Sequence, residues 1–269
     1  MYEKKVSTSN PGLIGGIIDD SGSVLEKLVG TTDEIYLWIS RYFGIILMEL
    51  LSRCTSMQGQ EAVIKPRYFN SFVLYGSQPQ VWGEPIMDIE TTVTKYQTSD
   101  NSLGLGGHLG GTDASAAFEK MYDILHEAVQ EDRFEDSFPP MVFHLTDGLS
   151  ATDATPAAEK IRQLKTSDGN VLIVNAFIGT DTSLEYTGPA DFPGYLDESE
   201  AGPSQDNIRL FHMSSEMPAT IFNNLVEDGI FPKLREGCRL FFDVRTKEML
   251  KHVIQVVGSI GSRTERTER

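Results

Sequence analysis

The sequence predicts an α/β fold built on a mostly parallel sheet. Short apolar runs without alternation are typical of strands that are covered on both faces. Between them lie segments whose apolar residues recur at spacings of three and four, as on one face of a helix. Because the two kinds of segment alternate, we expect βαβ units. The predicted strands are residues 13–18, 71–75, 141–145, 171–178 and 208–213.

Four longer segments predict the helices that cover this sheet. In the second of them, Ala117, Met121, Ile124, Leu125 and Ala128 form one apolar face. The predicted helices are residues 33–51, 115–129, 156–164 and 218–226.

The first of these helices contains the most hydrophobic stretch of the chain, residues 35–51. It includes Arg41 and Glu49 and is shorter than the roughly 20 apolar residues that span a bilayer. We therefore expect a buried helix. Trp38, which lies within it, and Trp82 are interpreted as packing residues.

The remaining elements are an edge hairpin and a C-terminal strand and helix. Pro79 and Pro85 lack a backbone donor and suit only an edge or a turn, so residues 81–89 and 90–96 predict an edge hairpin. Residues 239–244 predict a strand and residues 246–257 a helix. The expected organisation is an N-terminal tail (1–11), one domain (12–257) and a flexible tail (258–269).

One long segment of that domain, residues 181–207, is acidic. It holds seven acidic residues and no basic ones, with three prolines and three glycines, so it predicts a long loop. The simpler interpretation is a solvated excursion. The alternative is a flap that contacts a partner through Tyr186, Phe192 and Tyr195.

Charge and cysteine content restrict the classes of partner and compartment. Lys and Arg total 23 against 39 Asp and Glu, a net charge of −16, which repels nucleic acid and anionic lipid and favours cations or basic protein surfaces. Cys54 and Cys238 have no metal-ligand spacing, which suits a reducing compartment. The first residues lack the apolar stretch of a secretory signal, so a cytoplasmic location is expected.

Oxygen-bearing side chains follow the predicted strands where a site would form in an open α/β sheet. Asp19, Ser21 and Ser23 follow the first strand, Thr112 follows a glycine-rich stretch (104–111), and Asp147 follows residues 141–145. Three hydroxyls and two carboxylates are the hard ligands that Mg²⁺ prefers. Because Mg²⁺ keeps several waters, such a site leaves room for an external ligand.

These residues resemble the metal-ion-dependent adhesion site (MIDAS) of von Willebrand factor A (VWA) domains. That site combines D-x-S-x-S, a distant Thr and a distant Asp. Asp19, Ser21 and Ser23 match the first part, Thr112 in GGT the second and Asp147 in TDG the third. The resemblance covers roughly residues 12–226 and implies a Rossmann-like, doubly wound sheet with one antiparallel edge strand and helices on both faces.

The resemblance also implies how a bound Mg²⁺ or Mn²⁺ would be used. The serines would bind the metal directly, the threonine directly or through water, and the aspartates largely through water. The cation would then keep much of its charge and attract an Asp or Glu of a protein partner. Val24 stands where Met is frequent, and Asp20 where an uncharged residue is usual; Asp20 would add negative charge beside the cation and make an incoming carboxylate less welcome.

Simpler interpretations exist for each of these residues taken singly. Acids and hydroxyls also cap helix N-termini. The glycines of 104–111 do not form a P-loop, because no Lys followed by Ser or Thr closes them. His108 lies in this loop and could reach the site, whereas His144 and His212 fall in predicted strands and are interpreted as satisfied core residues.

Three functions remain open from the sequence. The first is a metal-dependent protein-binding module without enzymatic activity. The second is a metal-dependent hydrolase of phosphoesterase type, since an exposed Mg²⁺ can activate water. The third is a structural subunit whose metal site is idle. The chain is also similar to compact intracellular bacterial VWA proteins of the tellurium-resistance type, which implies a stress or regulatory complex with a kinase, phosphatase or AAA+ ATPase component.

Overall fold

A central, mostly parallel sheet organises the protein. The computed structural model describes residues 2–27, 31–148, 150–179, 188–202 and 204–259. The strand order is β11-β10-β7-β1-β4-β5, with β6 also paired to β4. The five strands from β11 to β4 run parallel, and β5 and β6 pair antiparallel with β4 at the edge. The strands are β1 (Gly12–Asp19), β4 (Tyr68–Tyr75), β5 (Pro79–Val81), β6 (Met87–Asp88), β7 (Met141–Thr146), β10 (Leu172–Ile178) and β11 (Phe241–Val244).

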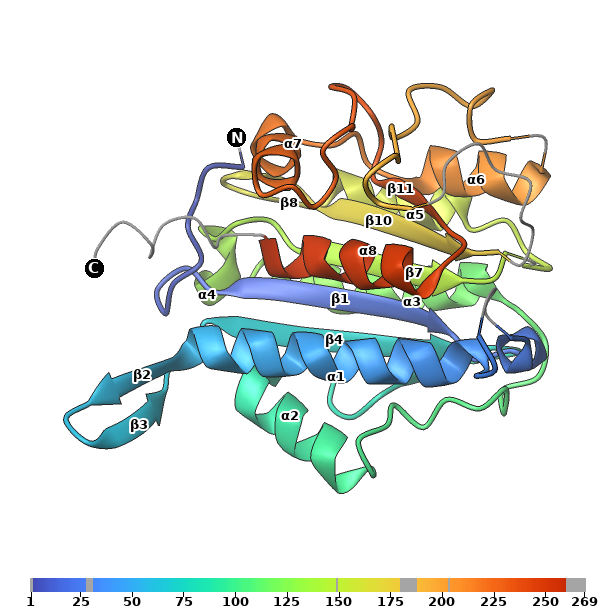
Figure 1. The fold of residues 1–269 in the computed structure, drawn as a ribbon. Helices are drawn as coiled ribbons and strands as arrows, with labels where there is room; N and C mark the ends of the chain where they lie inside the picture. Colours follow the sequence, from blue (N-terminus) through green and yellow to red (C-terminus); the bar gives the residue numbers. More distant parts are fainter. Residues whose placement is uncertain (1, 28–30, 149, 180–187, 203, 260–269) are drawn as a thin grey trace.

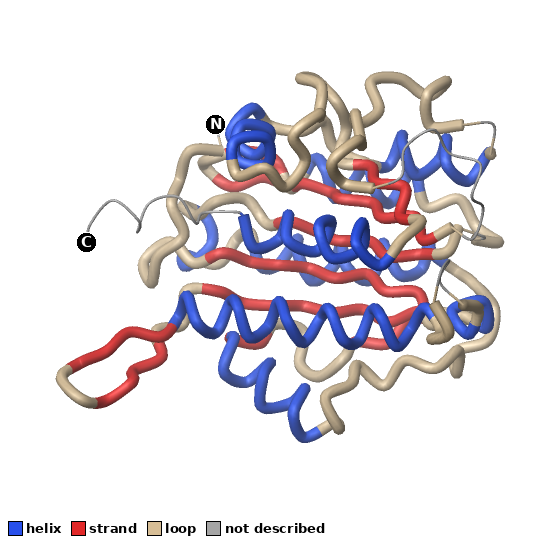
Figure 2. The backbone as a smooth tube through the Cα atoms, viewed as in Figure 1, coloured by secondary structure: helices blue, strands red, loops and turns tan. Residues whose placement is uncertain are grey.

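Helices cover both faces of this sheet, as Figures 1 and 2 show. In the foreground lie α1 (Ile35–Cys54), α8 (Lys247–Ser259) and α2 (Ile89–Thr98), with α7 (Ala219–Glu227) beside α8. Behind the sheet lie α3 (Ala114–Ala128), α4 (Asp132–Glu135), α5 (Thr155–Gln163) and α6 (Gln205–Met213). The predicted α/β class, with a mostly parallel sheet, an antiparallel edge and helices on both faces, is confirmed.

The central strand β1 is buried along its whole length, as its unalternating sequence GLIGGIID predicts. Two glycines let its neighbours approach closely. A Cβ on Gly16 would lie 2.5 Å from the Phe72 ring, and one on Gly15 would lie 3.2 Å from Met121 of α3. β1 therefore packs closely against β4 on one side and against α3 on its face.

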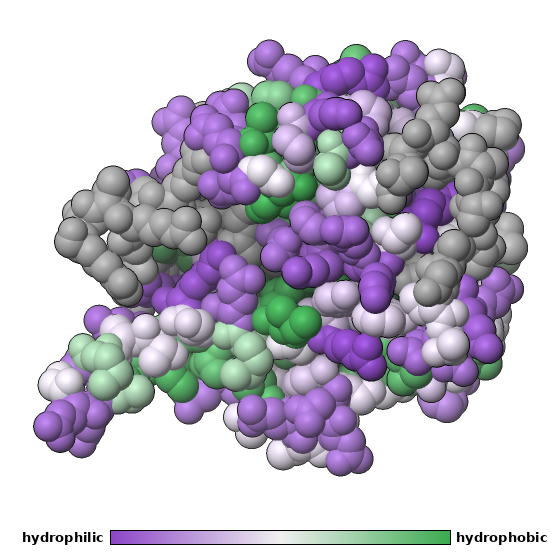
Figure 3. All heavy atoms as spheres, viewed as in Figure 1, coloured by the Kyte–Doolittle hydropathy of each residue, from purple (hydrophilic) through white to green (hydrophobic). Residues whose placement is uncertain are grey.

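Helix α1 is the one described helix that is long and apolar enough to cross a membrane by length and composition. In the structure its buried residues, which include Ile39, Phe43 and Leu47, belong to the core under the sheet. The expected buried helix is confirmed. Ile45 and Met48 on its outer side are about half exposed, and Figure 3 shows hydrophobic residues beside α1 on an otherwise mostly hydrophilic face.

Two predicted strands are wrong. Residues 208–213 belong to helix α6, with Leu210, Phe211 and Met213 buried, and a short apolar run does not distinguish a strand from a buried helix. Residues 90–96 of the predicted edge hairpin belong to α2, whose N-cap Asp88 accepts a hydrogen bond from Thr91 N at 2.7 Å. The edge position of Pro79 is confirmed.

The acidic segment contributes to the core. Phe192 is fully buried and Tyr195 nearly so, and the Phe192 ring packs against Phe231 and Phe242. These two aromatic residues are therefore not available as the partner anchors of a flap, and the flap's third predicted anchor, Tyr186, lies outside the described residues. His212 is also not a core residue: it lies on α6, and its Nε2 is 2.7 Å from Glu198.

The smaller elements lie at the periphery. The hairpin of β2 (Thr55–Gln58) and β3 (Glu61–Ile64) projects beyond the end of α1 (Figure 1), and β8 (Lys165–Thr166) pairs with β9 (Gly169–Asn170). A 3-10 helix, η1 (Gly22–Leu25), follows β1. Trp38 and Trp82 are buried, as predicted. Residues 260–269 of the predicted flexible tail lie outside the described part of the chain.

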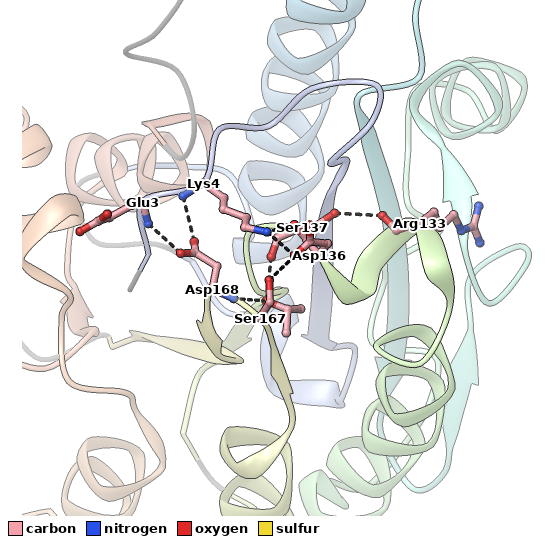
Figure 4. A network of polar contacts seen from close by, with 8 residues as sticks. Glu3, Lys4, Arg133, Asp136, Ser137, Ser167 and Asp168 are labelled. Carbon is pink, nitrogen blue, oxygen red and sulfur yellow. Dashed lines mark hydrogen bonds and ion pairs between the residues drawn. The ribbon is translucent and has the colours of Figure 1, made fainter.

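The N-terminal residues are tied to the amino end of the sheet (Figure 4). The Asp168 carboxylate accepts hydrogen bonds from the backbone N–H groups of Glu3 (3.1 Å) and Lys4 (3.0 Å). Lys4 also forms an ion pair with Asp136, which in turn accepts a hydrogen bond from Ser167. We name these contacts of residues 3 and 4 with Asp136, Ser167 and Asp168 the amino-end network.

Candidate metal centre

The first part of the candidate site is the turn between β1 and η1. Asp19 is the last residue of β1, and its Oδ1 accepts a hydrogen bond from Ser21 N at 2.9 Å. A carboxylate that binds the N–H two residues on is typical of a tight polar turn. The turn brings the Ser21 and Ser23 hydroxyl oxygens to 2.9 Å of each other. The D-x-S-x-S spacing thus gathers its three oxygen-bearing side chains.

The neighbouring strand β7 brings Asp147 to this turn. β1 and β7 are parallel, with Ile18 opposite Leu145, so their carboxyl ends coincide. Thr146 at the end of β7 donates a hydrogen bond to Asp19 Oδ2 at 3.0 Å. The carboxyl of the next residue, Asp147, is hydrogen-bonded to the Ser23 side chain. Two predicted acids and two predicted hydroxyls therefore belong to one connected cluster.

Thr112 is positioned between these two strand ends through backbone contacts. On one side, Gly22 N donates to the carbonyl of Gly110 at 3.3 Å. On the other, Ala151 N, which follows the Asp147 turn, donates to the Thr112 carbonyl at 3.0 Å. The glycine-rich stretch thus passes directly beside both loops and brings Thr112 to them.

The two acids of the cluster are unfavourably placed as free anions. Asp19 is fully buried, and this burial raises the pKa of its carboxyl, although the Ser21 N–H opposes the shift. Burial also raises the pKa of Asp147 to about 6; the Ser23 hydrogen bond lowers it, and the charges of Asp19 and Glu26 raise it further. Among the described residues, no Lys or Arg forms an ion pair with either acid.

One carboxylate oxygen of Asp147 indicates which kind of group the cluster could bind. Its Oδ2 is buried and has no hydrogen-bond partner. A buried polar atom without a partner is costly and calls for an explanation, of which a bound ion is one. The atoms of the cluster that could bind a metal are hydroxyl and carboxylate oxygens, the ligands preferred by Mg²⁺ and Mn²⁺. The residues present therefore fit a hard divalent cation.

A different kind of metal site is not found in the part of the chain that the structure describes. It contains no group of three or more His, Cys, Asp or Glu side chains arranged to hold a metal ion. The candidate centre depends on hydroxyls, which such clusters do not include.

Two features of the site were not predicted from the sequence: the contacts of Thr146 and the direction of the Asp20 side chain. Thr146, adjacent to Asp147, bonds both to Asp19 and to the N–H of Gly148, at 3.0 Å in each case. The sequence predicts that Asp20 adds negative charge beside the cation, but its carboxylate is engaged by the glycine-rich loop. Its Oδ1 accepts hydrogen bonds from Gly106 N (2.7 Å) and Gly107 N (2.8 Å). The sequence shows that a hydroxyl or an acid stands at a strand end, but it does not show the direction in which that side chain points.

The histidines near the sheet have separate roles. His144 is buried in β7; its Nε2 is 2.8 Å from the Tyr75 hydroxyl and its Nδ1 is 2.8 Å from Asn175 Oδ1. The expected satisfied core histidine is confirmed, and burial lowers its pKa to about 4. His108 is exposed in the glycine-rich stretch, and a Cβ on Gly106 would lie 2.4 Å from its Nε2.

Comparison with known proteins gives a likeness of fold. No protein-family model and no curated protein sequence matches this chain. A structure of proximal thread matrix protein 1 from the mussel byssus, with a zinc-occupied MIDAS motif, has a TM-score of 0.50 and 12% identity. That match covers 94% of this chain and 46% of the mussel protein, so this chain spans about half of its length.

Two bacterial structures also match over nearly the whole chain. The conserved hypothetical protein BatB from Bacteroides thetaiotaomicron has a TM-score of 0.48 and 10% identity, over 93% of this chain and 98% of that one. An aerotolerance-related membrane protein from Bacteroides fragilis has a TM-score of 0.48 and 12% identity, over 90% and 96% of the two chains.

The strand order, the antiparallel edge and the likeness to the mussel structure define a VWA-like α/β fold. The five predicted site residues lie at or just after the carboxyl ends of its parallel strands, or beside them, where ligands bind in open α/β sheets. This chain is thus similar in fold to a protein whose solved structure carries zinc in a MIDAS motif.

Proposed function

We propose that the protein is a divalent-metal-dependent protein-binding module. Mg²⁺ or Mn²⁺ is held by Ser21, Ser23 and Thr112 as direct or near-direct ligands, with Asp19 and Asp147 acting largely through water. An Asp or Glu of the partner completes the coordination. The proposal rests on one observation above the others: the buried, unpartnered Oδ2 of Asp147 beside two linked serine hydroxyls.

The chemistry of the donors supports a binding role. Neutral hydroxyls as direct ligands leave the cation with much of its charge, so that it attracts an external carboxylate. The carboxylates of Asp19 and Asp147 are already engaged with Ser21 N, Thr146 and Ser23. Such bonds orient ligands and the waters between them. The chain's own residues hold the cation, and the partner supplies the ligand that specificity requires.

A non-enzymatic role agrees with the buried histidine nearest the site in sequence. His144 lies three residues before Asp147, and both of its ring nitrogens are bonded inside the sheet. A general base must reach the proton that it removes, directly or through one water. His144 is therefore committed to the core.

The partner is proposed to be basic around its metal-binding acid. The chain has a net charge of −16, which attracts basic surfaces and speeds their encounter with it. An intracellular, cytoplasmic complex with a kinase, phosphatase or AAA+ ATPase component remains our proposal for its setting, motivated by the resemblance in sequence motif alone.

The direct test measures Mg²⁺-dependent retention of a partner. Wild-type protein and Ser21→Ala are immobilised and exposed to native lysate in Mg²⁺ or in EDTA. The proposal expects a partner that only the wild type retains, and only in Mg²⁺. Ser137→Ala is the matched control, because Ser137 is an equally buried serine at the opposite end of the sheet.

Two other results would replace the proposal. Partners that are indifferent to both EDTA and Ser21→Ala would make the metal site idle and the protein a structural subunit. Release of phosphate from a generic ester with Mn²⁺, lost in Asp19→Ala, would establish a hydrolase instead.

A further inference from the structure

The loop that carries Thr112 has little structure of its own. Residues 103–113 contain no helix or strand. Gly104, Gly107 and Gly110 all have positive φ, of 77°, 69° and 77°. Glycines in such conformations suit a tight path but lose the most conformational freedom on ordering. Something outside the loop must hold it in one conformation.

Asp20 makes three of the contacts that hold this loop; Gly76 and Ser77, which follow β4, make others, to Leu109, Gly111 and Asp113. Its Oδ1 accepts from Gly106 N at 2.7 Å and Gly107 N at 2.8 Å, and its carbonyl accepts from Leu109 N at 3.2 Å. Two successive N–H groups that converge on one carboxylate oxygen form an anion-binding nest. Asp20 is 2% exposed, and no basic side chain forms an ion pair with it within the described residues. Its charge is balanced by the loop backbone.

Asp20 is itself held rigidly. Its N–H donates to the carbonyl of Tyr75, the last residue of β4, at 2.7 Å. Asp20 therefore links the loop to the carboxyl ends of both β1 and β4, while Gly76 and Ser77 bond to it from the end of β4 alone. The loop also passes close to the turn after β1: a Cβ on Gly107 would lie 3.2 Å from the carbonyl oxygen of Ser21.

We infer that Asp20 is a positioning residue that latches the glycine-rich loop so that Thr112 reaches the metal site. It does not act as a nearby charge on the cation. This inference rests on the proposed metal-binding function, but the latch itself is a property of the metal-free protein. In sequence, Asp20 stands between the proposed metal-site residues Asp19 and Ser21, yet its carboxylate binds the backbone of the glycine-rich loop.

Two substitutions separate the latch from the charge. Asp20→Asn removes the charge and keeps a side-chain oxygen that can accept from Gly106 and Gly107. Asp20→Ala removes both. The first measurement is amide hydrogen exchange of residues 103–112 without metal, which reports local opening. We expect Asp20→Ala to lose protection in this loop and Asp20→Asn to retain it, with unchanged exchange in β1 and β7 of both.

The second measurement is Mg²⁺ affinity by calorimetry, with circular dichroism to confirm folding. Asp20→Ala should weaken Mg²⁺ binding about tenfold or more and Asp20→Asn no more than about threefold, because supporting residues commonly change metal affinity by such factors. On a Thr112→Ala background, the effect of Asp20→Ala should largely disappear, since residues that act together are not additive.

The outcomes separate the latch from the function. Equal weakening by Asn and Ala, with loop protection intact in both, would overturn the latch and assign the effect to charge. An undiminished effect of Asp20→Ala on the Thr112→Ala background would overturn the link to Thr112. If wild-type protein binds no Mg²⁺, the proposed function fails, and exchange in the loop still decides whether Asp20 latches it. Should Asp20→Ala not fold, Asp20→Ser gives the same comparison with Asn.

Discussion

Acidic residues at the two ends of the central sheet lie in opposite environments. At the amino end, Asp136 pairs with Lys4 and Ser167, and these hydrogen bonds lower the pKa of its carboxyl. At the carboxyl end, burial raises the pKa of Asp147 to about 6 and leaves one of its oxygens without a partner. The first arrangement is complete within the chain, whereas the second fits the proposed binding of a cation from outside.

This difference separates stability from function. Groups with strongly perturbed pKa values that lie at the loops of an α/β sheet are candidates for a functional site. The amino-end network of residues 3 and 4 with Asp136, Ser167 and Asp168 holds the N-terminal segment against the sheet (Figure 4). We expect substitutions at one end to change ligand binding and substitutions at the other to change only stability.

The largest expected effect is on metal binding. Asp147→Ala removes a proposed outer ligand and a side chain that interacts with Ser23, so Mg²⁺ affinity should fall about 10- to 100-fold. Asp136→Ala, at the amino end, should leave it unchanged. Isothermal titration with MgCl₂ measures both. Equal affinities for Asp147→Ala and wild type would break the contrast between the two ends.

The next effect concerns His144, between the two ends. Its pKa of about 4 lies below the ordinary 6.5, because burial disfavours the charged ring. The unfolded chain binds more protons between pH 6.5 and 4, so the folded state loses up to about 3 kcal/mol as pH falls through that window.

This loss can be isolated by comparison with a variant. Urea unfolding of wild type and His144→Gln at pH 7 and pH 4.5 should show a smaller pH dependence in the variant. Imidazole NMR should show one histidine that stays neutral well below pH 6. A His144 ring that titrates near pH 6.5 would contradict the prediction.

Asp147→Asn should stabilise the metal-free protein at neutral pH. The folded pKa of Asp147 is raised from 3.8 to about 6, so its contribution to stability is complete below 3.8 and is lost as pH rises through 6. In EDTA at pH 7, the amide avoids that loss and should raise the free energy of unfolding by up to about 3 kcal/mol. The gain should shrink at pH 4.

The matched variant at the amino end should behave in the opposite way. Asp136→Asn loses a favourable ion pair with Lys4 and should be slightly less stable than wild type at pH 7. Chemical unfolding measures both changes. If Asp147→Asn and Asp136→Asn both lower the free energy of unfolding, the carboxyl end does not need a cation to balance its acids.

The smallest expected effect is at the N-terminal segment. Asp168→Ala leaves the N–H groups of Glu3 and Lys4 without their acceptor, at a cost of about 1 to 2 kcal/mol. Mg²⁺ affinity should not change, since the network lies at the far end of the strands. Thermal unfolding and calorimetry measure the two quantities, and a parallel loss of Mg²⁺ affinity would show that the ends are coupled.

Sequence alone located the frame of this protein because its signals were long or repeated. The helix of residues 115–129 has a sustained apolar face, and β1 is an unalternating apolar run, so both were placed to within a residue or two. Residues 208–213 were misassigned because six residues hold too few turns to show a helical period. The burial of Phe192 depends on distant rings that no local pattern contains.

The candidate site divides along the same line. The sequence by itself determined which oxygen-bearing side chains follow which strands, and parallel strands place such residues at one end of a sheet. Only the tertiary structure decided that Asp20 turns to the glycine-rich loop and that Asp147 keeps an unpartnered oxygen. The physical reason is that the direction and desolvation of a side chain depend on groups far away in the chain, which spacing does not record.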